Sequence, residues 1–433
     1  MKQLTDISTP FSEVATTLPL PGADLGWLQT LRQQAQALFE RHGLPAKKVE
    51  DWKYTSLWQL SQEGFTHEAR PVSLDFNRLA EVALLEDAFR VVIVDGQFDA
   101  ALSQLDKLES GLTIKPLSQA LAQTENLLGA QIDIEKPGLN AINTMLMQEG
   151  AFVHVAADKL VDKPIELLVI STEENNRLAS HLRHLIQMDK GSKATVIEHY
   201  VSLGDTQGFT DVVTEVKLDE KASLNHFKLQ HESLGHYHIA TLASRQAAGS
   251  VWNTNNIALG GKLARNDIHS QLLGEESHVT MDGLYLLAGD QHIDNHTRID
   301  HAVPNTTSDE VYKGVMDDNS HAVFNGKVIV HKDAQKTDSS QSNKNLLLSR
   351  SCEIDSKPEL EIYADDVKCA HGSTVGQIDE THLFFLRTRG LDEVTARSLL
   401  TYAFAVDVLH RITSEPIRQA LSNVVEKRLP RGA

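Results

Sequence analysis

The sequence predicts a mainly β protein whose core is a right-handed parallel β-helix, or solenoid, over residues 151–385. Short Val, Ile, Leu and Thr runs alternate with Gly, Asn, Asp and Ser from about residue 150 to 380, and turn clusters recur there with a near-constant period. Helical patterns stand on either side of this stretch. We therefore divide the chain into an N-terminal helical and mixed α/β region (1–150), the β-helix core and a C-terminal helical region (386–433).

The N-terminal region opens with an amphipathic helix between Asp24 and Gly43. Apolar residues recur there at helical spacing, Asp24 is a candidate N-cap, and Gly43, followed by Leu-Pro, ends the pattern. Farther along, RVVIVDGQF at 90–98 has the composition of a buried strand that ends in an Asp-Gly turn. Helix and strand are therefore mixed in this region.

The solenoid prediction rests on the rhythm of the turns. Small or charged clusters precede strands at residues 189, 219, 247, 274 and 317, with separations of 30, 28, 27 and 43 residues. A period in the high twenties is typical of a solenoid, and we interpret the longer step as room for an extra turn. A β-sandwich, the alternative, would need closely spaced Asn-Gly hairpins, and the one clear Asn-Gly lies at 325–326. Because a solenoid has unpaired backbone groups at its ends, we expect the flanking regions to cap it.

After Gly390 the helical period returns. Asp392 is a candidate cap for a first helix with an apolar stripe, and Ser414 with Pro416 can start a second. A helix near the end of a chain can place part of such a stripe on its own domain and part on a partner. The residues that we assign to partner binding are Leu399, Leu400, Ala403 and Phe404.

Composition excludes several classes of function. The chain carries 41 Lys and Arg against 59 Asp and Glu, a net charge of −18, which would repel nucleic acid and anionic membrane surfaces. No apolar run approaches the roughly 18 residues of a membrane helix, and the first 22 residues resemble neither a secretory signal nor a transit peptide. Two cysteines, Cys352 and Cys369, are too few for a disulfide framework, so we expect a reducing compartment, the cytoplasm.

Common enzyme motifs are missing from the sequence. The string nearest to a phosphate-binding loop, ALGGKLAR at 258–265, has Asn256 in place of the first glycine and Leu263 in place of the Ser or Thr. There is no dinucleotide-binding G-x-G-x-x-G, no G-x-S-x-G and no H-E-x-x-H. The chain therefore does not hydrolyse ATP through such a loop.

Twenty histidines are many, and His292, His296 and His301 form the densest group. Ligands to one ion should share a strand face or lie on neighbouring rungs, but the steps of four and five put His301 on the opposite face unless a bulge intervenes. We favour hydrogen-bonded or solvated structural histidines here over a metal site.

Cys369 and His371, in YADDVKCAHGSTVG at 363–376, indicate a metal site more clearly than these histidines do. They are two residues apart, so on a strand both side chains face the same side, and thiolate with imidazole suits iron, zinc or copper. Two ligands are too few, so the others would come from a second polypeptide. Lys368 beside the thiol would favour the thiolate. The alternative is that Cys369 fills the core and His371 lies in a turn before Gly372.

Several long strings resemble the SufB/SufD family of iron-sulfur cluster assembly proteins, and most of all its SufD branch. They are EDWKYTSL at 50–57, VDGQF at 94–98, ATVIEHYVSL at 194–203, FNGKVIVHKDAQKTDSSQSNKNLLLS at 324–349 and KPELEIYADDVKCAHGSTVG at 357–376. SufB chains tend to be longer and richer in cysteine, whereas this chain has two cysteines. The resemblance implies a helical N-terminal region, a right-handed parallel β-helix and a C-terminal helical region.

The resemblance also implies a function and partners. Members of this family work in a complex of a SufB-like subunit with a SufC-like ABC ATPase, on which an iron-sulfur cluster is built before transfer. By the same resemblance, Cys369 and His371 match positions that face SufB at the subunit interface and take part in cluster formation, and the C-terminal helices match the part that docks the ATPase. The isolated chain could instead form a homodimer.

We therefore expect a non-enzymatic scaffold subunit that binds iron or a transient iron-sulfur cluster together with its partner. Two other classes compete with this hypothesis. A carbohydrate-active β-helix enzyme would need an aromatic-lined cleft and export, and 6% aromatic residues with no signal peptide argue against both. A self-contained metal hydrolase would be built on the histidines at 292–301.

Overall fold

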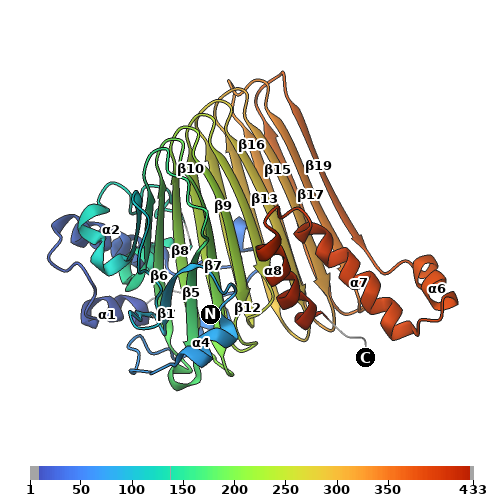
Figure 1. The fold of residues 1–433 in the computed structure, drawn as a ribbon, viewed down its shortest axis with the longest axis horizontal. Coiled ribbons are helices and arrows are strands. Elements are labelled where there is room, and N and C mark those ends of the chain that lie inside the picture. The colour runs from blue at the N-terminus through green and yellow to red at the C-terminus, as the bar shows by residue number, and fades with distance from the viewer. Residues whose placement is uncertain (1–8, 137, 430–433) are drawn as a thin grey trace.

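The computed structural model describes residues 9–136 and 138–429, and the architecture is mainly β. Residues 1–8, part of the stretch in which we looked for a leader segment, lie outside the described residues. From β4 onward the chain coils so that successive strands alternate between two large sheets, which confirms a parallel β-solenoid flanked by helices (Figure 1).

The first sheet has ten strands, in the spatial order β19 (Lys368–Gly376), β17 (Asp338–Leu347), β15 (Thr307–Met316), β13 (His278–Leu287), β11 (Val251–Ala258), β9 (Ser223–His231), β7 (Lys193–Leu203), β5 (Ile165–Thr172), β1 (Phe89–Val94) and β2 (Gln97–Phe98). The second has nine, in the order β18 (Glu353–Ile362), β16 (His321–Val330), β14 (His292–His301), β12 (Leu263–Leu272), β10 (Tyr237–Gln246), β8 (Phe209–Leu218), β6 (Ala179–Met188), β4 (Glu149–Val155) and β3 (Leu112–Pro116). Neighbours pair in parallel except for β1 with β2 and β3 with β4, at the N-terminal end.

The turn rhythm predicted from the sequence is real, and its longer step ends at a strand of the other sheet. The clusters at 189, 219, 247 and 274 precede β7, β9, β11 and β13, which all belong to the ten-stranded sheet. The cluster at 317 precedes β16, which belongs to the other sheet. The step of 43 residues therefore spans one and a half coils and contains the turn before β15, which is the extra turn for which the longer step left room.

A left-handed residue recurs two positions before six strands of the ten-stranded sheet. These residues are Gly191, Lys221, Gly249, Glu276, Asn305 and Lys336, with φ between 57° and 67°. The next residue is small and buried in each case, and several of these donate a hydroxyl hydrogen bond back across the turn, as Ser192 does to the Asp189 carbonyl at 2.6 Å. One local turn geometry, repeated about every 30 residues, therefore sets the coil.

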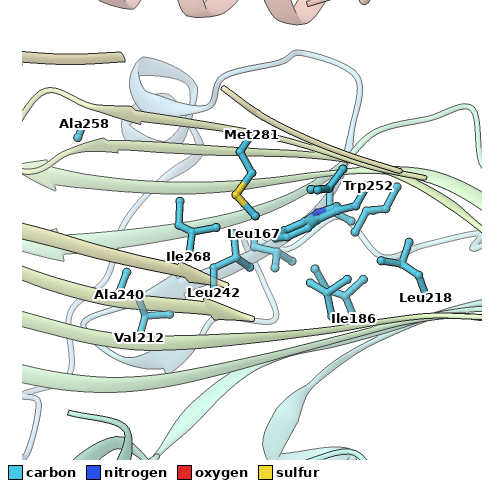
Figure 2. Close-up of a cluster of buried hydrophobic side chains, with 14 of the residues drawn as sticks. Leu167, Ile186, Val212, Leu218, Ala240, Leu242, Trp252, Ala258, Ile268 and Met281 are labelled. Atoms are coloured by element: carbon cyan, nitrogen blue, oxygen red, sulfur yellow. The ribbon is translucent and has the colours of Figure 1, made fainter. Parts of the chain in front are cut away.

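The interior of the solenoid holds the main hydrophobic core. Alternate side chains of both sheets point inward, as the two-residue period of a strand requires. Figure 2 shows Trp252, Met281 and Leu242 among the packed side chains, and all three are almost fully buried. Burial of a large side chain stabilises a fold by roughly 1.5–3 kcal/mol, so this continuous column is the main source of stability.

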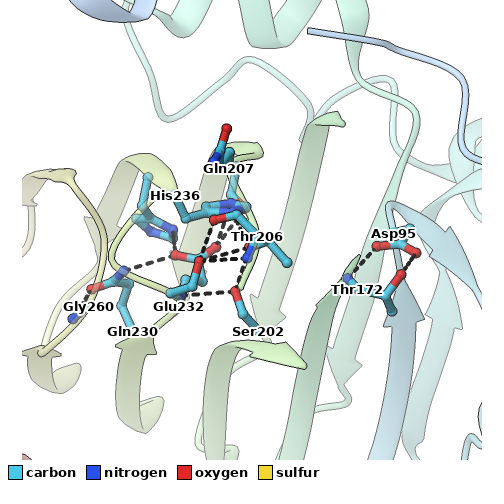
Figure 3. Close-up of polar contacts among 12 residues, drawn as sticks. Asp95, Thr172, Ser202, Thr206, Gln207, Gln230, Glu232, His236 and Gly260 are labelled. Atoms are coloured by element: carbon cyan, nitrogen blue, oxygen red, sulfur yellow. Dashed lines mark hydrogen bonds and ion pairs between the residues drawn. The ribbon is translucent and has the colours of Figure 1, made fainter. Parts of the chain in front are cut away.

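Polar side chains connect successive coils where the chain turns between the sheets (Figure 3). The carboxylate of Glu232 is buried and accepts hydrogen bonds from Thr210 at 2.6 Å and from Gln230 at 2.9 Å. Asp95 likewise accepts from the backbone N–H and the hydroxyl of Thr172, at 2.8 and 2.7 Å. Such bonds satisfy polar groups that the turns would otherwise bury unpaired.

The N-terminal region covers the first coils of the solenoid (Figure 1). Its helices are α1 (Thr9–Thr17), α2 (Gly26–His42), α3 (Trp58–Gln62), α4 (Phe76–Val82) and α5 (Asn140–Leu146), with short 3-10 helices at Glu50–Trp52, Leu117–Gln119, Leu121–Gln123 and, farther on, Glu173–Asn175. Helix α2 ends at Gly43 as predicted, but its N-cap is Leu25 and not Asp24. The predicted strand at 90–98 is a hairpin of β1 and β2, because Asp95 and Gly96 both have positive φ.

Up to residue 429, three helices follow the last strand, one more than the sequence predicted. Helices α7 (Glu393–Leu409) and α8 (Glu415–Arg428) match the expected pair, and the Asp392 side chain caps α7 by accepting from the Thr395 N–H at 2.9 Å. Helix α6 (Glu380–Thr388) was not predicted, and the expected boundary at residue 385 falls inside it. Its nine residues are too short for a clear helical period in the sequence.

Candidate functional site at the open end of the solenoid

The C-terminal end of the solenoid is open within the described residues. Strands β18 and β19 are the last members of their sheets, and each pairs with a neighbouring strand on one side alone. Nearly all residues of β19 are exposed, and those of β18 are at most half-buried. In Figure 1, β19 lies at the far edge of the coil from α1 and α2. An edge of this kind presents free backbone donors and acceptors.

Cys369 and His371 both lie on β19, and the strand is regular between them. They pair in register with Ser339 and Gln341 of β17, whose side chains are buried in the interior. Both side chains therefore point toward the interior side of the open end, as the two-residue spacing predicted. Cys369 packs in part against the main core, whereas His371 is exposed. The structure thus combines both interpretations of Cys369, because its thiol touches the core and is also accessible.

The thiol of Cys369 is less acidic than the sequence suggested. Burial raises its pKa, and the negative charge of Asp338 raises it further. Asp338 stands opposite Lys368 in the register of β17 and β19, which sequence inspection could not reveal. In the isolated chain the thiol therefore stays protonated at neutral pH, and a metal ion would have to displace the proton.

Polar side chains continue from this site into the interior. Ser373, two residues beyond His371, hydrogen-bonds Ser356 of β18 at 2.8 Å, and Ser356 donates to Asn343 at 2.8 Å. Asn343 in turn donates to the Tyr285 hydroxyl at 2.9 Å. Side chains of both sheets therefore form a hydrogen-bonded chain just inside the open end. No sequence signal marked these residues, because the contacts cross from one sheet to the other.

Cys352 lies in a different environment from Cys369. It is buried in the main core, and its thiol lies 3.3 Å from the Ser349 carbonyl and 3.5 Å from the Met316 carbonyl. Such a thiol acts as a small packed side chain.

The histidines of β14 do not converge on one ion. His301 faces the interior, is fully buried and hydrogen-bonds Thr306 at 2.8 Å and Ser308 at 2.9 Å. His292 and His296 lie on the outer face, where His292 contacts the Thr55 hydroxyl at 2.8 Å and His296 contacts Asp294 at 3.0 Å. The alternation expected from the spacing is therefore observed, and no bulge overrides it.

The four residues that we assigned to partner binding on α7 divide into two pairs. Leu399 and Ala403 are exposed, whereas Leu400 and Phe404 are half-buried. Phe404 packs against the solenoid, and Lys313 lies over its ring at 4.7 Å while donating to its carbonyl at 3.1 Å. One part of the stripe therefore holds α7 to its own domain.

An exposed apolar surface on α6 and α7 extends the free part of the stripe. Phe384 and Phe385 of α6 are 69% and 56% exposed, and Val394 and Leu399 of α7 are 40% and 47% exposed. Sequence reasoning missed the two phenylalanines because it did not predict α6. Adjacent aromatic residues just after the last strand were the available signal. Exposed apolar groupings of this kind mark contacts with other proteins.

The segment EDWKYTSL at 50–57 lies on the outer face of the nine-stranded sheet. Trp52 is buried and stacks on the Arg265 guanidinium at 3.8 Å, and Thr55 donates to Asp294 at 2.5 Å. The side chain of Glu50 pairs with Lys357 of β18 at 2.8 Å. A cavity of about 480 Å³ opens beside this segment, and its acidic and basic side chains are largely paired with one another. The segment therefore fastens the N-terminal region to coils close to the open end.

In the described part of the chain, none of the helices has the length and apolar character needed to cross a membrane.

Comparison with protein families gives two adjoining matches. Residues 169–404 match the SufBD core domain of SUF system FeS cluster assembly, and residues 20–167 match the N-terminal region of SufBD proteins. Together these matches cover the N-terminal region from residue 20 onward, the solenoid and most of α7.

Named relatives agree with the family matches. The chain is 34% identical over 406 residues, 93% of both chains, to the iron-sulfur cluster assembly protein SufD of Escherichia coli. It is 32% identical to an iron-sulfur cluster assembly SufBD family protein of Synechocystis, over 98% of this chain and 96% of that one. It is 30% identical to the chloroplastic protein ABCI7 of Arabidopsis thaliana, over 92% and 86%. The chain therefore belongs to the SufBD family and is an iron-sulfur cluster assembly protein of the SUF system.

Proposed function

We propose that this chain is a non-catalytic scaffold subunit that joins a SufB-like subunit through its open end and a SufC-like ABC ATPase through its C-terminal helices. One observation carries the proposal: Cys369 and His371 share one face of an edge strand at the open end of the solenoid. Iron or a nascent iron-sulfur cluster is then cargo that passes through the interface. The family match favours this function over a carbohydrate-active enzyme or a metal hydrolase.

The open end suits a second β-solenoid as partner. Strands β18 and β19 offer unpaired backbone groups on one side, and a partner strand can satisfy them without rearrangement of this chain. The exposed side chain of Val375 and the half-buried side chains of Ile354 and Leu360 supply apolar surface around this edge. A second copy of this chain could use the same edge, which would make the isolated chain a homodimer.

The ligands on this chain are suitable but incomplete. A thiol and an imidazole are ligands that iron accepts, and two of them hold an ion too weakly for storage. Because the pKa of the Cys369 thiol is raised, the free chain does not attract a cation strongly. Ligands from the partner complete the set, which makes cluster formation depend on assembly of the complex.

Two cysteines, both without a disulfide, are consistent with a reducing compartment, and we assign the chain to the cytoplasm.

The cluster experiment separates a ligand role from a packing role. The Cys369→Ala and His371→Ala variants are expected to co-purify with SufB-like and SufC-like partners at parental yield but to lose most of the iron and acid-labile sulfide formed in cells. Thr374→Ala is the matched control, because Thr374 lies on the same strand and on its opposite face. Normal cluster content in intact complexes of both variants would remove the ligand role.

The ATPase experiment uses the exposed residues of α6 and α7. Replacing Phe384 and Leu399 by Asp is expected to abolish capture of the ATPase while capture of the SufB-like subunit persists. Leu234→Asp is the control, because Leu234 is 55% exposed and lies in a turn of the solenoid. Undiminished ATPase capture by the double variant would rule out this surface as the docking site.

A further inference from the structure

The outer face of the last coils carries a second group of possible metal ligands, separate from Cys369 and His371. His321 begins β16, and Glu353 begins β18 directly opposite it in the register of the two strands. Asp355 follows two residues later on the same face of β18. The neighbours Ala322 and Ile354 pack on the interior core, so these three side chains point outward.

The ligand atoms of these three residues are close together. One nitrogen of His321 and one carboxylate oxygen each of Glu353 and Asp355 lie within 4.8 Å of one another. The His321 Nε2 is 2.8 Å from the Asp355 Oδ2. His321 and Asp355 are about one quarter exposed, and Glu353 is more exposed, so an ion in solution can reach the site. Among residues 9–136 and 138–429, no other three such side chains meet in this way.

The charge around these residues favours a cation. Neither Glu353 nor Asp355 forms an ion pair with a lysine or arginine among the described residues, whereas nearby Glu359 pairs with Lys357 at 2.6 Å. The two carboxylates are therefore not neutralised by a lysine or arginine among the described residues and can attract a metal ion.

We propose that His321, Glu353 and Asp355 bind a divalent first-row transition metal ion on the outer face of the solenoid. One imidazole with two carboxylates suits Zn²⁺ or Fe²⁺, whereas Mg²⁺ and Ca²⁺ prefer oxygen ligands alone. Three side-chain ligands leave coordination positions for water, so the ion is exchangeable. This site does not depend on the proposed function, because it shares no residue with the open-end pair.

Zinc binding to the full-length chain tests the proposal, since Zn²⁺ has no redox chemistry. The background is the Cys369→Ala/His371→Ala variant, which removes the other proposed ligands. Isothermal titration at pH 7.5 is expected to show one equivalent of Zn²⁺ that His321→Ala eliminates and that Asp355→Asn weakens by roughly 10–100-fold. Mg²⁺ in tenfold excess is expected not to compete. An anaerobic titration with Fe²⁺ then shows whether iron occupies the same equivalent.

His382→Ala is the matched control, because His382 lies 3.5 Å from Asp379 on the surface but meets no third ligand. The control is expected to retain the full equivalent. The proposal is overturned if the background chain binds no Zn²⁺ at 100 µM, if His321→Ala retains the equivalent, or if His382→Ala loses it as well. Circular dichroism of Glu353→Gln, which keeps the size of the side chain, shows whether loss of binding reflects loss of fold.

Discussion

The two ends of the solenoid differ in whether the edges of their last strands are covered. At the N-terminal end, β2 covers the edge of β1, β3 runs antiparallel to β4, and helices α2 and α5 pack over the first coils. At the C-terminal end, β18 and β19 have no further strand beside them among the described residues. Strand edges are therefore covered within the chain at one end, and at the other end they stay unpaired among the described residues.

The interiors of the two ends differ as well. Val153, Leu167 and Leu182 fill the first coils, whereas Glu310, Gln341 and Asn343 point inward near the open end. Burial of an apolar side chain lowers the free energy of the folded state directly. A buried polar side chain costs free energy unless it forms hydrogen bonds. Polar side chains enter the interior soon after the first coil, as His184 and Glu198 show, so a wholly apolar filling is confined to the first coil and inward polar groups continue to the open end.

The largest expected effect is at the closed end. Glu215 accepts hydrogen bonds from Arg183 at 2.6 Å and from the N–H groups of Gly129 and Gln131, so it ties the N-terminal region to the solenoid. Glu215→Ala leaves a buried arginine unpaired, and we expect a loss of about 3–5 kcal/mol in the free energy of unfolding by urea. Glu220→Ala, which breaks the exposed pair with Lys190, should leave the midpoint unchanged. Equal losses of unfolding free energy in Glu215→Ala and Glu220→Ala would contradict the role of Glu215 in joining the N-terminal region to the solenoid.

A smaller, pH-dependent effect is expected near the open end. Burial, with Asp282 and Asp309 close by, raises the pKa of Glu310 from its ordinary 4.5 to about 7. The folded chain therefore holds a proton that the unfolded chain releases, and stability falls as pH rises from about 4.5 to 7 and stays low above 7. Glu310→Gln cannot ionise and should be more stable than the parent at pH 8 by roughly 1–3 kcal/mol.

The measurement for Glu310→Gln is urea unfolding of both chains at pH 4.5 and pH 8. The advantage of the variant should shrink toward zero at pH 4.5, where Glu310 is protonated in the folded parent and about half protonated in the unfolded parent. The same advantage at both values of pH would show that Glu310 keeps its charge in the fold.

The two cysteines give a finer comparison. Cys352 is buried in the core, and Cys352→Ala should lower the unfolding free energy by about 1 kcal/mol with cluster formation retained. Cys369 is partly exposed, so Cys369→Ala should cost less than about 0.5 kcal/mol while cluster formation is lost. Paired urea titrations and iron analysis of the complexes provide the check. A reversed order of stability would make Cys369 the packing residue.

The smallest effect on stability is expected from a charge at the open edge. Val375 is 52% exposed on the inward side of β19, so Val375→Lys should change the unfolding free energy by no more than about 0.5 kcal/mol. An inward-pointing charge opposes edge-to-edge pairing, and the variant should lose association with the SufB-like subunit and any homodimer. Sedimentation velocity and co-purification measure this loss. Thr374→Lys, on the outer side of β19, should associate normally.

The sequence alone determined the class of the fold and the face shared by Cys369 and His371. Both follow from local periods: turn clusters recur about once per coil, and a strand alternates its side chains every two residues. The cap at Asp392, the end of α2 at Gly43 and the opposite orientation of His301 were predictable for the same reason. Each depends on residues that are neighbours in the chain.

Only the tertiary structure decided which strands share a sheet, which parts of α7 are free and which side chains meet across coils. The turn clusters could not show that the cluster at 317 precedes a strand of the other sheet, because both sheets use similar turns. The raised pKa of Cys369 depends on its burial and on Asp338, 31 residues away, and the ligand group at His321 joins residues more than 30 positions apart. In a parallel solenoid, residues one coil apart stack about 4.8 Å from each other, so the chemistry of a site is set by register between strands, which no local pattern contains.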